Sequence, residues 1–176
     1  MEHLKYPIGK FDFEKGVNDS EIPDRIKEIE ELPAHLKKVI SALTAEQLET
    51  PYRPGGWKVR QVVHHLVDSH TNALIRFQLA LTEDAPSIKP YKENLWAELP
   101  FQNALDVKQT GDLLDLLHQR FVALLRSMTA ADFARSYVHP EYQRVYTLQK
   151  AVGLYAWHGK HHLAHITRLI ERNFDK

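Results

Sequence analysis

Apolar residues recur at three- and four-residue spacing in four long stretches of the chain, a pattern that places them on one face of an α-helix. The first stretch covers residues 20–43, and Pro33 inside it is expected to kink the helix or split it in two. The other three cover about residues 57–82, 110–128 and 148–173. Four amphipathic helices of this length predict an all-α four-helix bundle.

Shorter elements are predicted between the long helices. Thr44 and Thr129 each begin a Thr-Ala stretch that indicates a short capped helix, and residues 137–147, rich in Tyr and Val, could form a small hairpin. Residues 84–109 hold three prolines and form a long connection that could cover a site. Residues 1–19 are expected to be an extended arm. The two halves of the chain therefore show the same order of elements: a helix, a short helix, a loop and a long helix. This similarity is either an internal repeat or chance.

The length and charge of the chain limit the class of protein to which it can belong. A chain of 176 residues suits one helical-bundle domain covering residues 1–176. The 23 basic and 23 acidic residues balance, so the chain lacks the basic footprint of a nucleic-acid binder. It has neither an apolar run that could span a bilayer nor a secretory signal, so we expect a cytoplasmic protein with no membrane partner.

Histidine stands out in a chain that has no cysteine. The absence of cysteine excludes disulfides, thiolate metal ligands and a cysteine nucleophile. Of the eleven histidines, seven fall in two short windows. The first window holds His64, His65 and His70, and the second holds His158, His161, His162 and His165.

The three histidines of the first window face different sides of their helix, which advances by roughly 100° per residue. His70 lies among the aliphatic residues, and His64 lies on the far polar side. His65 belongs to a polar stripe. The other members of that stripe include Asp68, Ser69, Asn72 and Arg76.

In the second window, His158 and His162 lie closest to the apolar face and His161 points furthest away from it. Imidazoles at i and i+4 can bind one metal ion, and the stripe containing His65 is the obvious source of a third ligand. Three neutral imidazoles suit Zn²⁺, Ni²⁺ or Fe²⁺ rather than Mg²⁺ or Ca²⁺. Three protein ligands leave an open position, which is the catalytic arrangement.

A structural interpretation competes with this one. A pair at i and i+4 also arises by chance, and a lone histidine on an apolar face is usually an ordinary core residue, as we expect of His70. His35 and His118 are likewise assigned to the core or the surface. The segment HHLVDSH favours metal binding, because it supplies a third imidazole together with Asp68.

Two segments resemble the DinB/YfiT-like superfamily: GGWKVRQVVHHLVDSHTNALIRFQLALTE at residues 55–83 and LYAWHGKHHLAHITRL at residues 154–169. The resemblance extends over nearly the whole chain. It implies a four-helix bundle, a homodimer and one divalent metal held by three histidines. The matching positions are His65, the histidine directly before leucine in HHLVDSH, and the pair His158 and His162. Similar proteins are S-transferases that use a low-molecular-weight thiol, bacillithiol in particular, and others are thiol-dependent isomerases.

We therefore expect a metal-dependent enzyme with zinc or nickel that acts on a small molecule. A metal that activates water would give a hydrolase, and one that activates a thiol co-substrate would give an S-transferase. Asp68 is expected to orient an imidazole or to act as a base. Asn72, Arg76, Tyr155 and Trp157 are candidate walls of a substrate pocket, although ordinary packing explains them equally well. The alternative from another class is a non-catalytic, metal-binding structural dimer.

Two expectations concern stability. The long apolar stripes should let the bundle fold without metal. Acid should release the metal while the helices persist, because we expect the core to be aliphatic and not to titrate.

Overall fold

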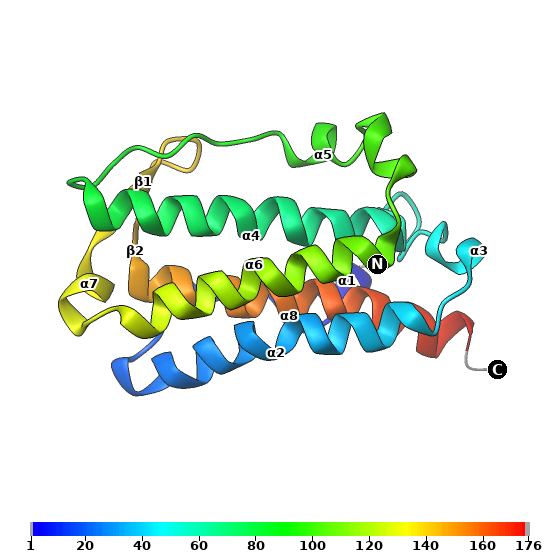
Figure 1. Ribbon diagram of the computed structural model, residues 1–176, viewed down its shortest axis with the longest axis horizontal. Helices are drawn as coiled ribbons and strands as arrows, with labels where there is room; N and C mark the ends of the chain where they lie inside the picture. Colours follow the sequence, from blue (N-terminus) through cyan, green and yellow to red (C-terminus); the bar gives the residue numbers. More distant parts are fainter. Residues whose placement is uncertain (1, 175–176) are drawn as a thin grey trace.

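The computed structural model describes residues 2–174 and shows four long helices (Figure 1). They are α2 (Ile22–Ser41), α4 (Val59–Thr82), α6 (Val107–Ser127) and α8 (Leu148–Asn173). The predicted all-α bundle is thus confirmed. No helix in this part of the chain is both long and apolar enough to cross a bilayer.

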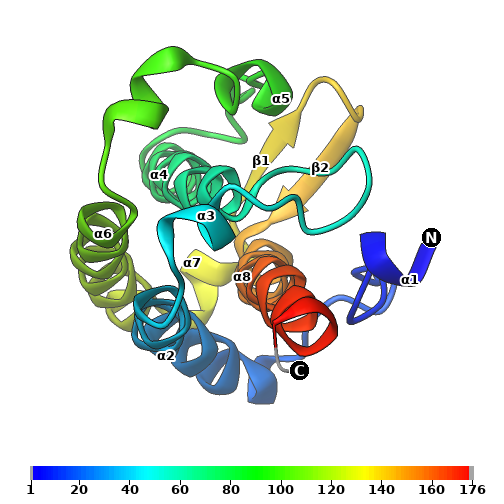
Figure 2. The ribbon, with the colours of Figure 1, turned by 90° about the vertical axis from the view of Figure 1, so that its right-hand side faces the viewer.

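Each long helix packs against two others. Helices α2 and α4 lie opposite one another, and each contacts both α6 and α8 (Figure 2). Helices α4 and α6 run in the same direction, because the chain between them returns along the outside of the bundle before α6 begins (Figure 1). This return is the predicted long connection.

Short elements complete the fold, and Thr44 and Thr129 cap two of them through hydroxyls that accept the backbone N–H three residues later. The predicted hairpin pairs Ser136 with Thr147. One helical turn lies in the segment expected to be an extended arm. The short elements are α1 (Glu2–Lys5), α3 (Ala45–Leu48), α5 (Glu93–Trp96), α7 (Ala130–Ala134), β1 (Ser136–His139), β2 (Arg144–Thr147) and two 3₁₀ turns, Asp19–Glu21 and Pro100–Ala104.

Pro33 does not split the first long helix, because α2 is continuous from Ile22 to Ser41. A proline inside a helix has no N–H for the carbonyl four residues earlier, which here is that of Ile29. The imidazole of His118 on α6 lies at this carbonyl instead, with Nδ1 2.6 Å from the oxygen. The neighbouring helix therefore supplies the hydrogen bond that Pro33 cannot.

The core consists of two apolar clusters with a layer of imidazoles between them. One cluster includes Phe77 and Phe121 and packs near the hairpin, and the other includes Leu36 and Leu66 and packs toward the opposite end. On α4, α6 and α8, the residues between the two clusters include histidines. The core is thus not wholly aliphatic. The expectation of acid-resistant helices rested on a premise that is wrong.

Candidate metal centre

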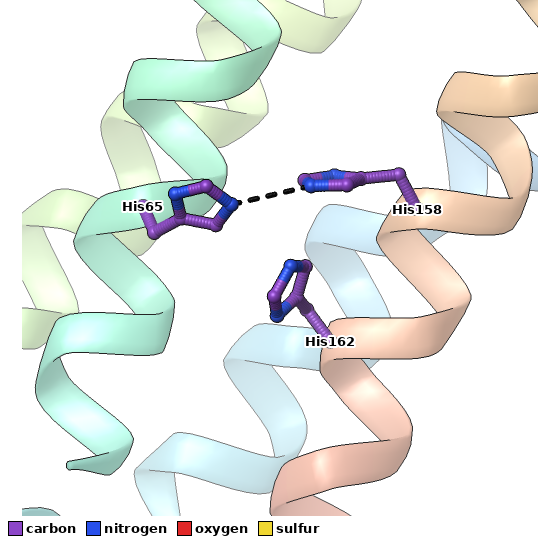
Figure 3. Close-up of side chains that lie close together, drawn as sticks. All are labelled: His65, His158 and His162. Atoms are coloured by element: carbon purple, nitrogen blue, oxygen red, sulfur yellow. Dashed lines mark hydrogen bonds between the residues drawn. The ribbon is translucent and has the colours of Figure 1, made fainter. Parts of the chain in front are cut away.

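Three imidazoles meet between α4 and α8 (Figure 3). His65 comes from α4, and His158 and His162 lie one turn apart on α8. Each offers a ring nitrogen, and the three nitrogens all lie within 4.8 Å of one another. The Nε2 atoms of His65 and His158 are 3.2 Å apart. The structure therefore brings together the three histidines that the spacing and the resemblance selected.

The geometry of this group fits one metal ion. Two imidazole nitrogens on a tetrahedral ion, each at about 2.0–2.1 Å, are roughly 3.4 Å apart, close to the spacing seen for His65 and His158. The Nδ1 atom of His162 is buried and has no hydrogen-bond partner among the described residues. Neutral imidazoles are ligands for borderline divalent ions. Within the described chain, this group contains no fourth protein ligand.

Burial keeps the three imidazoles neutral. It lowers the pKa of His65 to about 3, and nearby His165 and His161 add to the effect. Burial, with smaller effects from neighbouring imidazoles, also lowers the pKa of His158 and of His162 well below the usual value. All three therefore have a free lone pair at neutral pH, as a metal ligand must.

A chain of imidazoles leads away from this group through the core. Nδ1 of His158 lies 3.2 Å from Nε2 of His70, and Nδ1 of His70 lies 2.8 Å from Nε2 of His118. Nδ1 of His118 then reaches the carbonyl oxygen of Ile29. His70 and His118 are buried, as expected of core residues, but both are hydrogen-bonded toward a candidate ligand.

The remaining histidines of the two windows are also buried, contrary to the helix-face prediction for two of them. His64 does not face solvent, because α6 covers it and places Thr110 Oγ1 3.2 Å from its Nδ1. His161 stacks on Trp157, with ring centroids 4.5 Å apart. His165 donates from Nε2 to the carbonyl of Lys5 at 3.0 Å, so the N-terminal segment covers it.

Two cavities meet at this centre. The larger has a volume of about 910 Å³ and extends from His158 toward the hairpin. The smaller, of about 420 Å³, is lined by His65, His162 and the N-terminal segment. Both cavities are lined by His158 and by Glu93 and Asn94 of α5. The long connection therefore contributes to the lining of both cavities.

The predicted pocket residues divide between these cavities. Arg76 and Tyr155 line the larger one, and Arg76 Nη1 donates to the Tyr155 hydroxyl at 2.9 Å. Trp157 lines the smaller one. Asn72 lines neither cavity and donates instead to the backbone carbonyl of Asp68 at 2.8 Å.

Asp68 does not take the position expected of a base or of a partner for an imidazole. Its carboxylate accepts from Gln102 Nε2 at 3.2 Å and lines neither cavity. Burial raises the pKa of this carboxyl, and the bond from Gln102 opposes that rise. The 3₁₀ turn that carries Gln102 lies in the long connection, whose path the helical pattern of α4 could not reveal.

Three residues at the centre were not selected from the sequence. Trp57 packs on His65, with ring centroids 4.6 Å apart, and stacks near His162. Glu93 and Asn94 lie at the junction of the cavities. Trp57 could have been selected, because it is an aromatic residue at the start of the helix that carries His65. Glu93 and Asn94 could not, because their segment shows no periodic pattern.

Fold and site together define a helical-bundle protein with a three-histidine centre at the meeting point of two cavities. The family model of the DinB superfamily matches residues 28–166, and the chain belongs to this superfamily. A protein of Bacillus cereus strain B4264, named "putative metal-dependent hydrolase", is 53% identical over 172 residues, which cover 98% of each chain. A protein of Bacillus mycoides strain KBAB4 with the same description is also 53% identical over 98% of each chain.

Solved structures agree with the fold. YfiT from Bacillus subtilis, described as "a probable metal-dependent hydrolase with an unusual four-helix bundle topology", superposes with a TM-score of 0.93 at 47% identity over 97% of each chain. A mycothiol-dependent maleylpyruvate isomerase has a TM-score of 0.66 at 12% identity, covering 88% of this chain and 62% of its own. The second similarity supports the fold alone.

Proposed function

We propose that this protein is a metal-dependent hydrolase in which His65, His158 and His162 hold one divalent ion, zinc or nickel. The observation that carries the proposal is the convergence of three neutral imidazoles, without a fourth protein ligand among the described residues, where two cavities meet. A closed structural site would be completed by a fourth side chain. The open arrangement therefore favours catalysis over the non-catalytic alternative.

When bound, a divalent ion lowers the pKa of a water or a thiol and so supplies a nucleophile near neutral pH. The protein contributes orientation and shielding. Trp57 packs on His65 and restricts its ring, and His70 does the same for His158 through a hydrogen bond. Glu93 lies at the junction of the two cavities.

A second candidate function is transfer to a low-molecular-weight thiol such as bacillithiol. The presence of two cavities that share His158 favours it, because a thiol and an electrophile could approach from different sides. In such a transfer the thiolate sulfur forms a bond to carbon, and the leaving group departs with its bonding electrons. Hydrolysis needs only one of the two cavities for an organic substrate.

The larger cavity indicates the chemistry of that substrate. Arg76 forms no ion pair with any described residue, and its Nε atom is buried without a hydrogen-bond partner. Five of the chain's seven tyrosines line the same cavity. Phenols can donate hydrogen bonds but do not neutralise a guanidinium at pH 7. We therefore propose a substrate with a carboxylate on a small apolar or aromatic body, held by Arg76.

Activity assays distinguish the two functions. Purified protein loaded with zinc is assayed against a panel of aryl esters, and against 1-chloro-2,4-dinitrobenzene with cysteine as the thiol, each with and without chelator. Ester cleavage that is lost on chelation and in His162→Ala supports hydrolysis, and metal-dependent loss of the chloride supports transfer. If neither reaction depends on the metal, the proposed function is wrong.

Binding of benzoate and of its neutral analogue benzamide tests the role of Arg76. We expect the wild type to prefer benzoate, and Arg76→Gln to lose on the order of tenfold in benzoate affinity. Lys89→Gln, which removes an exposed cation from the same cavity wall, is the matched control and should change little. Equal losses in the two variants would mean that a general positive field, not Arg76, attracts the anion.

A further inference from the structure

Pro33 leaves one backbone carbonyl in the middle of α2 without its helical donor. The carbonyl of residue i accepts from the N–H of residue i+4, and for Ile29 that residue is Pro33, which has no N–H. Pro33 and Ile29 are both buried, so water does not replace the missing bond. Nδ1 of His118 lies 2.6 Å from the Ile29 oxygen and takes that place.

A carbonyl oxygen can only accept a hydrogen bond, so Nδ1 of His118 must carry the proton. A neutral imidazole has one N–H, which leaves Nε2 of His118 as an acceptor. Nδ1 of His70, 2.8 Å away, must then donate to it, and Nε2 of His70 becomes an acceptor in turn. One carbonyl thus determines the tautomers of two imidazoles.

The hydrogen bonds continue from His70 to the candidate centre. Nδ1 of His158 lies 3.2 Å from Nε2 of His70 and must donate to it, so Nε2 of His158 keeps its lone pair. That lone pair is on the atom that faces His65, 3.2 Å away. Each imidazole of the chain thus uses its one N–H as donor and its other nitrogen as acceptor. The direction of every bond in the chain is therefore unique.

We propose that His118 and His70 are positioning residues that hold His158 in the Nδ1–H tautomer and so direct its Nε2 lone pair at a divalent ion. The inference rests on the proposed function, because it assigns a role toward the ion of that same site. A ligand imidazole whose other nitrogen donates a hydrogen bond is better oriented and more basic. Here the donor chain ends on a carbonyl that a proline has left free.

Core packing alone would not need this arrangement. His70 and His118 are both buried, so each of their ring nitrogens requires a hydrogen-bond partner. An aliphatic residue of similar size would require none. The chain links four helices, since its members come from α2, α6, α4 and α8. Every bond points from the candidate ligand toward Ile29.

The first test compares two substitutions of His118. His118→Gln keeps both bonds, since the amide N–H can donate to Ile29 and the amide oxygen can accept from His70, whereas His118→Leu keeps neither. Zn²⁺ affinity is measured by competition with a chelating dye. We expect His118→Leu to lose about 10–100-fold and His118→Gln to stay within a few-fold of the wild type. Equal affinities in the two variants would overturn the proposal.

The second test needs no substitution that could prevent folding. ¹⁵N NMR of the metal-free wild type at neutral pH reports which ring nitrogen carries the proton. We expect the Nδ1–H form at His118, His70 and His158; an Nε2–H form at His158 would refute the chain. Because this readout needs neither metal nor turnover, it separates the inference from the proposed function. An inactive protein with the expected tautomers would contradict only the function.

Discussion

Acid should unfold the metal-free protein, because the bundle buries neutral imidazoles. His118 is one of these imidazoles. Burial lowers the pKa of its imidazole from 6.5 to about 4, against smaller upward effects of the Ile29 carbonyl and of Asp115. His70 faces it from α4 and stays neutral as well. As the pH falls, the unfolded chain binds a proton before the folded one does, so the free energy of unfolding decreases.

The size of the effect follows from the two pKa values. With 6.5 in the unfolded and about 4 in the folded protein, the single group of His118 removes about 2 kcal/mol of stability between about pH 8 and about pH 5. The loss continues down to about pH 4 and is complete below it. The total free energy of unfolding of a domain of this size is only about 5–15 kcal/mol. Other buried histidines, including His161 and His165, act in the same direction.

The assay is urea denaturation, followed by far-UV circular dichroism in the presence of chelator at about pH 8 and about pH 5. His118→Gln removes the titrating group and keeps its bonds, so its acid-induced loss should be about 2 kcal/mol smaller than that of the wild type. His35→Gln, at an exposed position on α2, should behave like the wild type. A wild type whose stability is equal at the two pH values, or a His118→Gln variant with an undiminished loss, would refute the reasoning.

Three further predictions address the site and the packing. Elemental analysis should find the metal lost from His162→Ala and retained in His64→Ala, whose buried imidazole bonds to α6; full occupancy in His162→Ala would remove it from the ligand set. Chelation at neutral pH should leave the helical circular dichroism unchanged, because the apolar clusters do not involve the ion, and a loss of signal would show that metal drives folding. Gly159→Ala should lower the free energy of unfolding by about 1–3 kcal/mol, because a Cβ there would overlap Leu32 of α2; an unchanged thermal midpoint would show that Leu32 relocates freely.

The bundle could be predicted because each long helix has one apolar face, and spacing alone reveals such a face. The last helix was placed at the residues where the structure has it, Leu148–Asn173. The continuity of the helix at Pro33 could not be predicted, because it depends on a replacement hydrogen bond from His118 of another helix. The helical turn at Glu2–Lys5 is too short to show a period.

The site was predictable to the extent that it lies on helices. His158 and His162 share a face by their spacing, and His65, one member of the polar stripe, lies opposite them. Whether a polar stripe faces solvent, a cavity or another helix depends on what covers it. The hydrogen bond from Gln102 to Asp68 could not be predicted for that reason, because the connection that carries Gln102 has no periodic pattern.

The crossover between α4 and α6 lines the larger cavity, whereas the candidate metal ligands lie on the long helices. It contributes Lys89, Glu93 and neighbouring residues to the larger cavity, but none of the three candidate ligands. Several hydrogen bonds attach it to the rest of the bundle: Ile88 N–H donates to the Val138 carbonyl, Gln61 Nε2 donates to the Ala97 carbonyl, and Gln102 Nε2 donates to Asp68. Because the free energy of closing a loop rises only slowly with its length, the segment between the bonds at Ile88 and Ala97 can be replaced by segments of other sequence and length. Libraries confined to that segment are then the direct route to altering which molecules enter, with the ion-holding frame carried over intact.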